Sequence, residues 1–231
     1  MNWTTILSEA HKNSILRLDD LADRYQVQEI VARNALGRYE ARGLVEHVSK
    51  KIYINKLNQQ FSVLDLANAL RPDSYISIET VLAETGASSQ SPAILTCVTT
   101  GYPKIFKSPS ITVAYRRIAK GLFWGFEEKS TRYNKYRIAV PEKALLDWIY
   151  LNRQEGLPTP LDEVNLQFLN AQKLREYAEK FPRTVKEVIN QLLLEHAFAA
   201  MRTTSSKIGN PDIQRNSSPP WNNLRERDCG F

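Results

Sequence analysis

Residues 28–38, which the sequence predicts to be helical, carry several hydrogen-bonding side chains. Leu36 and Tyr39 are the apolar residues expected to face inward, and Val27 is expected to fill the turn before the helix. The positions then left facing outward are Gln28, Glu29, Arg33, Asn34 and Arg38. In the major groove of duplex DNA, Arg can pair with guanine, and Asn or Gln with adenine. The pattern therefore predicts a helix that reads base edges.

The elements around this helix predict how it is presented. A preceding helix is expected over residues 19–25, and Gly43 stands where a left-handed helix C-cap is needed. A hairpin over residues 44–54 follows directly, with Lys50 and Lys51 in its polar turn. This order of helix, turn, helix and hairpin is typical of a winged helix-turn-helix, and basic residues at the wing tip can hold phosphates.

The charge of residues 1–56, the predicted first domain, leaves a second interpretation open. These residues include nine Lys or Arg and seven Asp or Glu, a net charge of only +2. Three helices and a hairpin also make a common protein-interaction module, since a fold alone does not specify a function. The basic turn and the Arg-bearing helix favour duplex DNA as the partner.

After a polar linker, the chain predicts a second, mixed α/β domain over residues 61–200, so that the whole chain belongs to the α+β class. Apolar spacing indicates two helices near its start, the second capped by Ser77, and a helical end that begins at Pro141. Between them lie β-rich stretches that we expect to form a small antiparallel sheet: 93–98, 110–115, 122–126 and 133–139. Residues 201–231 are rich in Ser, Asn, Pro and Arg and are expected to form a disordered tail.

Positive charge concentrates in the middle of the second domain. Residues 104–137 hold nine Lys or Arg and two Glu, a net of +7, against +6 for the whole chain. We expect a possible second basic surface from Lys104, Lys107, Arg116, Arg117, Lys120, Arg132, Lys135 and Arg137. Aromatic residues are interleaved, which suits a nucleic-acid surface. The pattern equally suits the solvated face of a sheet whose aromatics are core, and it also suits a docking face for an acidic protein.

Catalytic patterns are nearly absent from the sequence. No phosphate-binding glycine loop or nucleophile motif occurs, and the three His residues have no partners at metal-ligand spacing, so we expect neither a metal nor a cofactor. One weak pattern joins Asp73 with Glu127 and Lys129, which could hold magnesium and activate water as in a nuclease. An acidic and basic triplet after a strand is more often a solvated turn, and we therefore expect no enzymatic activity.

The compartment follows from cysteine use and apolar run length. Cys97 and Cys229 are too far apart to form a disulfide framework, which favours a reducing cytoplasm. No run of about 18 apolar residues occurs, so no membrane span is expected.

Three stretches, in this order, resemble the AbiEi family of antitoxins from bacterial type IV toxin–antitoxin systems. The first is the end of the expected winged helix at Ala41–Val45, which is generic. The second and third are more specific: Ser74–Gly86, which reads SYISIETVLAETG, and Ile138–Asp147, which reads IAVPEKALLD. The similarity spans roughly residues 1–200.

The resemblance implies an autoregulating DNA-binding repressor. Members of this family bind repeats in their own promoter through the winged helix. Their second domain opposes a nucleotidyltransferase-like toxin, without a stable complex between the two proteins. Many relatives are regulators with no demonstrated antitoxin role, so a stand-alone winged-helix transcription factor is the alternative.

Overall fold

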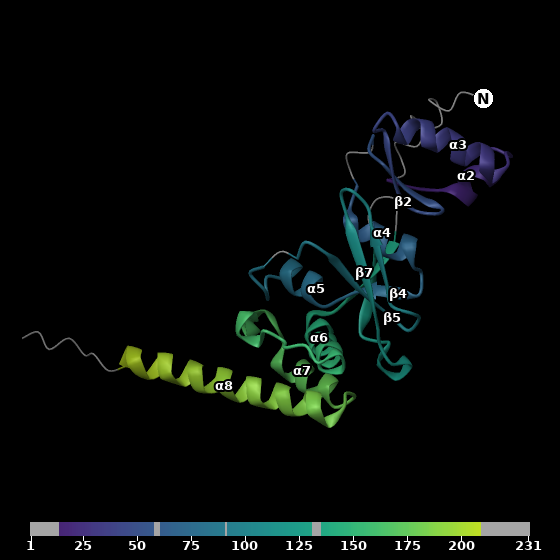
Figure 1. The fold of residues 1–231 in the computed structure, drawn as a ribbon. Coiled ribbons are helices and arrows are strands. Elements are labelled where there is room, and N and C mark those ends of the chain that lie inside the picture. Colours follow the sequence, from purple (N-terminus) through teal and green to yellow (C-terminus); the bar gives the residue numbers. More distant parts are fainter. Residues whose placement is uncertain (1–13, 58–60, 91, 131–134, 209–231) are drawn as a thin grey trace, which may run out of the picture. The chain divides into compact units, whose positions relative to one another are not determined.

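The computed structural model describes residues 14–57, 61–90, 92–130 and 135–208, with side chains described as far as residue 198 (Figure 1). Within these ranges the fold is mixed α+β, with seven α-helices and two sheets. Residues 2–10, whose apolar spacing also predicts a helix, and most of the expected tail lie outside the described residues. No helix in the described ranges is long and apolar enough to cross a bilayer.

Two helices and a three-stranded sheet make up the N-terminal elements. They are β1 (Ile15–Arg17), α2 (Leu18–Arg24), α3 (Glu29–Glu40), β2 (Val45–Ser49) and β3 (Ile52–Asn55). The sheet order is β1-β3-β2, with both pairs antiparallel. Leu18, Leu36 and Tyr53 are buried together between the helices and the sheet, and Val27 packs half-buried against them. The inward positions predicted for Leu36 and Tyr39 are confirmed.

Helix α3 ends as its sequence predicts. Gly43 has a left-handed φ of +70°. Its N–H donates to the Glu40 carbonyl at 2.8 Å, and the Leu44 N–H donates to the Tyr39 carbonyl at 3.0 Å. These two bonds form a Schellman motif, which satisfies carbonyls that the helix leaves open and turns the chain into β2.

The second sheet is larger than predicted and is mixed. Its strands are β4 (Ser74–Ile76), β5 (Leu95–Thr99), β6 (Lys104–Lys107), β7 (Thr112–Arg117), β8 (Phe126–Ser130) and β9 (Lys135–Ala139). They lie in the order β6-β7-β5-β4-β9-β8. The β5·β7 and β4·β9 pairs are parallel, so the prediction of a small antiparallel sheet was wrong. After β5 the chain forms the edge strand β6 and then turns back as β7. Strand β7 lies between β6 and β5, so it is antiparallel to β6 and parallel to β5.

Two local predictions in this region also fail. The strand expected over 122–126 begins only at Phe126, because Gly125 has a φ of +76° and Phe123 and Trp124 pack against the core from a loop after the 3-10 helix η2 (Lys120–Leu122). Ser77 does not cap the helix α5 (Glu79–Glu84). It is fully buried and its hydroxyl donates to Asp147 at 2.9 Å.

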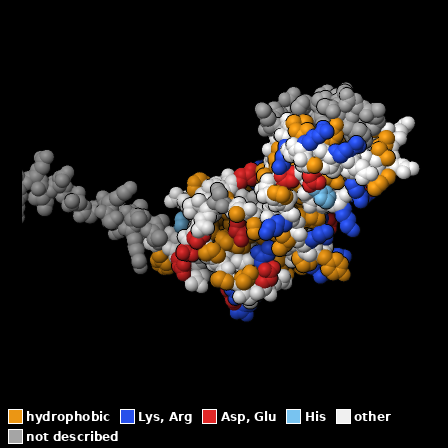
Figure 2. Space-filling view, turned by 45° about the horizontal axis from the view of Figure 1, so that its top comes forward, with side chains coloured by type: hydrophobic (Ala, Val, Ile, Leu, Met, Phe, Trp, Pro, Cys, Tyr) orange, Lys and Arg blue, Asp and Glu red, His pale blue; other side chains and the backbone are white. Residues whose placement is uncertain are grey.

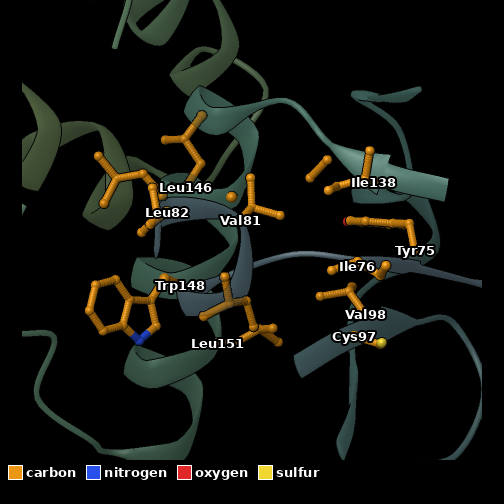
Figure 3. Packing of buried hydrophobic residues seen from close by; sticks show 14 of the residues in the cluster. Tyr75, Ile76, Val81, Leu82, Cys97, Val98, Ile138, Leu146, Trp148 and Leu151 are labelled. Carbon is orange, nitrogen blue, oxygen red and sulfur yellow. The ribbon is translucent and has the colours of Figure 1, made fainter. Parts of the chain in front are cut away.

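Helices cover both faces of the large sheet. Tyr115 of β7 donates its hydroxyl to the carbonyl of Ala67 in α4 (Val63–Leu70) at 2.6 Å. Tyr75 of β4 faces the other way and reaches Asp147 in α6 (Pro141–Glu155). Figure 3 shows side chains of the strands packed toward those of α5 and α6. The 3-10 helices η3 (Leu161–Glu163) and η4 (Leu166–Phe168) lead to α7 (Ala171–Ala178).

The small sheet and the large sheet share one hydrophobic cluster. Ile15, Ile52 and Ile54 of the small sheet belong to the same buried cluster as Tyr75 and Val98 of the large sheet. A polar contact joins the two sheets as well, between Glu46 of β2 and Ser110. The Glu46 Oε1 atom accepts from the Ser110 N–H at 3.1 Å and from its hydroxyl at 2.6 Å. The described residues between 14 and 193 accordingly belong to one compact unit.

The last helix, α8 (Arg183–Ile208), runs past the expected end of the second domain at residue 200. The second compact unit begins within this helix, at Leu194. Residues 183–208 contain no Gly or Pro, and the first ones that follow are Gly209 and Pro211. The polar Thr and Ser of this stretch only weakly disfavour a helix, so composition alone placed the tail too early.

Candidate nucleic-acid interface

The exposed face of α3 carries the predicted base-reading residues. Gln28, Arg33, Asn34 and Arg38 are exposed, and Glu29 at the first turn is half-exposed. Ala32, Ala35, Leu36 and Tyr39 form the buried seam that fixes this face against the small sheet. The Arg38 Nε atom donates to the Asn34 carbonyl at 3.4 Å, which holds its guanidinium along the helix surface.

Two apolar residues on α3 are exposed, and the sequence pattern had not predicted their exposure. Ile30 is 53% exposed and Val31 is 43% exposed, so neither belongs to the buried seam. Apolar side chains in a major-groove helix can contact the methyl group of thymine. A helical wheel anchored on Ala32 and Tyr39 places both residues off the seam, and this was the signal available in the sequence.

The tip of the β2–β3 hairpin is linked to α3 by an ion pair. Lys51 Nζ lies 2.7 Å from the Glu29 carboxylate, and an Arg33 nitrogen lies 4.0 Å from the other Glu29 oxygen. The hydrogen bond and charge of Glu29 raise the pKa of Lys51. Lys50 beside it is exposed. The Glu29 carboxylate thus partly neutralises two cations that sequence reasoning assigned to DNA.

The second basic set is not one surface. Lys104 and Lys107 lie on β6, whereas Lys135 and Arg137 lie on β9, four strands away in the sheet. At about 4.8 Å per strand this separation is roughly 19 Å. Figure 2 shows basic side chains interspersed with acidic and hydrophobic ones on the face in view. Arg132 lies outside the described residues.

Several members of this set already have protein partners. Arg116 donates to Asn152 at 2.9 Å and pairs with Glu155 at 3.0 Å. Lys135 pairs with Glu128 at 2.9 Å, and Arg137 lies over the Phe126 ring at 5.7 Å. Lys104 and Lys107 on β6, Arg117 at the end of β7 and Lys120 in η2 are exposed, but Lys107 pairs with Thr112 at the far end of β7 from Arg117.

The weak magnesium pattern does not converge in space. Glu127 pairs with Ile138, which pairs with Ile76, so Glu127 lies two strands across from β4. Asp73 precedes β4 by one residue and is three residues from Ile76, which puts it on the order of 14 Å from Glu127. Asp73 is instead paired with Arg71 at 3.2 Å. Within the described ranges, no three His, Cys, Asp or Glu residues gather so that they could hold a metal ion.

A buried polar cluster joins the two stretches on which the family resemblance mainly rests. Lys143 and Asp147, one helical turn apart on α6, are both fully buried and form an ion pair. Lys143 Nζ also donates to the Tyr75 hydroxyl at 2.9 Å, and the hydroxyls of Tyr75 and Ser77 each donate to Asp147 at 2.9 Å. Every charged member has a partner, which is the condition for burying such groups.

The electrostatics of this cluster favour a structural role. Burial lowers the pKa of Lys143 and raises that of Asp147, while their mutual attraction opposes both shifts. Next to Ser77, Ile78 is held at a φ of +61°, a backbone conformation that costs a β-branched residue about 1–3 kcal/mol. The cluster and the complete burial of Ile78 hold β4 and α5 to α6 despite this strain. From the sequence, only the start of a helix at Pro141 was predicted here.

Comparison with known proteins adds no family assignment. A scan against models of protein families gave no match to this chain, and a search of curated proteins gave none either.

Proposed function

We propose that α2, α3 and the β2–β3 hairpin form a winged helix-turn-helix, and that the chain is a cytoplasmic transcriptional repressor that binds duplex DNA. The observation that carries the proposal is the surface of α3, where Arg33, Asn34 and Arg38 are exposed on a helix whose opposite side is buried. Such a helix can enter a major groove without loss of its own core.

The proposed contacts are of two kinds: contacts to base edges, which read the DNA sequence, and contacts to phosphates, which position the protein on the DNA. Arg33 and Asn34 lie in the first half of α3, the part that reaches base edges in helix-turn-helix proteins, and their side chains can pair with guanine and adenine. Lys50 and Lys51 at the hairpin tip are placed to contact phosphates, which set register without reading sequence. Ile30 and Val31 add an apolar surface suited to thymine.

The test is a titration of the full chain on its own upstream DNA by fluorescence anisotropy. Arg33→Ala with Asn34→Ala should weaken binding at least tenfold, since each bidentate base contact is worth about 1–3 kcal/mol. Lys135→Ala is the matched control, because it removes a cation that is already paired with Glu128. Equal affinity of the double variant and the wild type would remove α3 as the reading helix.

We further propose that the chain resembles AbiEi antitoxins in its role as well as in sequence, and represses its own operon at promoter repeats. The support is the buried cluster that brings Ser74–Gly86 and Ile138–Asp147 together as one unit. The functional counterpart would be a nucleotidyltransferase-like toxin, opposed without a stable complex.

Co-expression with the product of a neighbouring nucleotidyltransferase-like gene tests this role. The wild type and the Arg33→Ala, Asn34→Ala variant should both restore growth when expressed from a foreign promoter. If neither protein restores growth although the wild type still binds DNA, the antitoxin role is wrong and the chain is a stand-alone regulator.

A further inference from the structure

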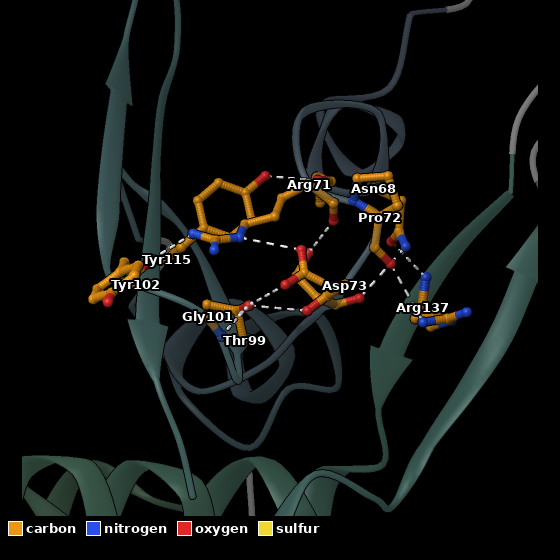
Figure 4. Close-up of polar contacts among 11 residues, drawn as sticks. Asn68, Arg71, Pro72, Asp73, Thr99, Gly101, Tyr102, Tyr115 and Arg137 are labelled. Carbon is orange, nitrogen blue, oxygen red and sulfur yellow. Dashed lines mark hydrogen bonds and ion pairs between the residues drawn. The ribbon is translucent and has the colours of Figure 1, made fainter. Parts of the chain in front are cut away.

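The turn between β5 and β6, residues 100–103, is held firmly although none of its side chains is buried. Arg71 donates to the Tyr102 carbonyl and its Nε donates to Asp73 at 3.2 Å. The Gly101 N–H donates to the Thr99 hydroxyl at 3.1 Å, and that hydroxyl donates to the Asp73 carbonyl at 2.9 Å. Figure 4 shows this set of contacts.

Close packing at Gly101 tightens the turn further. The Arg71 guanidinium occupies the space that a Cβ atom at this position would need. The same guanidinium lies over the ring of the buried Tyr115, 5.8 Å from its centroid. The turn is therefore anchored to the core through Arg71 while its outer side stays open.

The outer side of this anchored turn carries an exposed aromatic ring. Tyr102 is 82% exposed, and in Figure 4 its ring points away from the other labelled side chains. Pro103 follows it and restricts the backbone. Ile105, two residues beyond, is 67% exposed. Because the contacts to Arg71 use the Tyr102 carbonyl, the ring plays no part in holding the turn.

Two cations lie on the strands next to this turn, and the Nζ atom of one of them, Lys104, lies 4.3 Å from the centroid of the Phe106 ring. Lys104 pairs with Tyr115 in the sheet, and Arg117, two residues further along β7, is its diagonal neighbour on the same face. Both side chains are exposed. The nearby acid is Asp73, whose charge is offset by Arg71, so the corner is positive.

We propose that this corner, defined by Tyr102, Lys104 and Arg117, binds single-stranded nucleic acid, a site distinct from the duplex-reading face of α3. A base stacks on the Tyr102 ring, and Lys104 and Arg117 contact the phosphates on either side of it. A ring with few rotatable bonds on an anchored turn loses little entropy on stacking, and stacking tolerates any base. An acidic protein segment would use the two cations but would gain little from an isolated ring.

The experiment measures anisotropy of fluorescent dT and rU oligonucleotides of twelve nucleotides with the full chain. Tyr102→Ala should weaken binding about tenfold or more, and Tyr102→Trp should retain it, since stacking accounts for most of the difference. Phe168→Ala is the matched control. Phe168 is also an exposed aromatic residue, at 54% exposure, but it lies in η4 and not at this turn. Arg33→Ala should leave binding to these oligonucleotides unchanged.

Charge and stacking are separated by a second variant and a competitor. Lys104→Met with Arg117→Met should reduce the salt slope of binding by about one to two. Equal binding by Tyr102→Ala and the wild type would overturn the proposal. Displacement of the oligonucleotide by poly-Glu together with an unchanged Tyr102→Ala affinity would also overturn it, in favour of an acidic protein partner. Unchanged circular dichroism of each variant shows that the fold is intact.

Discussion

Replacement of Lys143 by Met tests whether the buried cluster is the structural link between β4 and α6. The substitution keeps an unbranched side chain of similar length in a site that is fully buried, but it removes the ammonium group that neutralises Asp147. Asp147 then keeps only the hydroxyls of Tyr75 and Ser77 as donors. Removal of one partner of a buried ion pair typically costs about 3–5 kcal/mol.

Protonation of Asp147 sets an upper limit on this cost and makes the cost depend on pH. Asp147 can escape its unpaired charge by protonation, which from an unfolded pKa of about 3.9 costs about 4 kcal/mol at pH 7 and about 1.5 kcal/mol at pH 5. The folded pKa of Asp147 in the variant lies above its unfolded value. The folded state therefore binds the extra proton, and the variant recovers stability as the pH falls.

Urea unfolding followed by tryptophan fluorescence at pH 7 and pH 5 measures both effects. We expect Lys143→Met to lose about 3–4 kcal/mol at pH 7 and about half of that or less at pH 5. Lys143→Met combined with Asp147→Leu removes both charges and should recover most of the loss at pH 7. A loss under about 1 kcal/mol at pH 7, or a loss independent of pH, would refute the reasoning.

Three further predictions concern charges on the surface of the N-terminal elements and at the contact between the sheets. Glu29→Gln frees Lys51 from its ion pair and should raise the affinity for unrelated duplex DNA about three- to tenfold; an unchanged affinity in a salt titration would contradict the neutralising role of Glu29. Lys50→Met with Lys51→Met should reduce the salt slope on duplex DNA by up to about two, and an identical slope would show that neither lysine meets a phosphate. Burial raises the pKa of Glu46, but hydrogen bonds such as those from Ser110 outweigh it and hold this pKa at about 2. Because that value lies below the ordinary 4.5, the stabilisation is complete above pH 4.5 and is lost as the pH falls toward 2. Glu46→Gln should therefore lower the Tm at pH 7 and flatten its fall between pH 5 and pH 3 in calorimetry, and a variant that keeps the wild-type acid profile would contradict this origin.

Much of the N-terminal structure could be predicted because its signals are local. The inward positions of Leu36 and Tyr39 follow from a helical period, and the left-handed Gly43 follows from the freedom of a residue without Cβ. The exposure of Ile30 was missed because residue type alone suggests burial, although a helical wheel anchored on Ala32 and Tyr39 places Ile30 off the buried seam. The sequence pattern therefore placed the polar part of the α3 surface but missed its apolar part.

The candidate sites in the large sheet depended on strand order, which no local pattern contains. The charge run at 104–137 predicted one basic surface, but insertion of β7 between β6 and β5 keeps Lys104 and Arg117 together and leaves Lys135 across the sheet. Likewise, the sequence pattern joined Asp73 and Glu127 as magnesium ligands, but in the sheet β9 lies between β4, which follows Asp73, and β8, which carries Glu127.

By itself, the sequence determined the α+β class, the inward positions of Leu36 and Tyr39 and the glycine that follows α3, because helix period and capping act over a few residues. The tertiary structure alone decided that Lys143 would be neutralised next to a tyrosine 68 residues away, and that the Tyr102 ring would stand open on a turn clamped by Arg71. These contacts join segments far apart in the chain. Their formation depends on the order in which strands pair and on which side chains that order buries, and neither is encoded in the spacing of neighbouring residues.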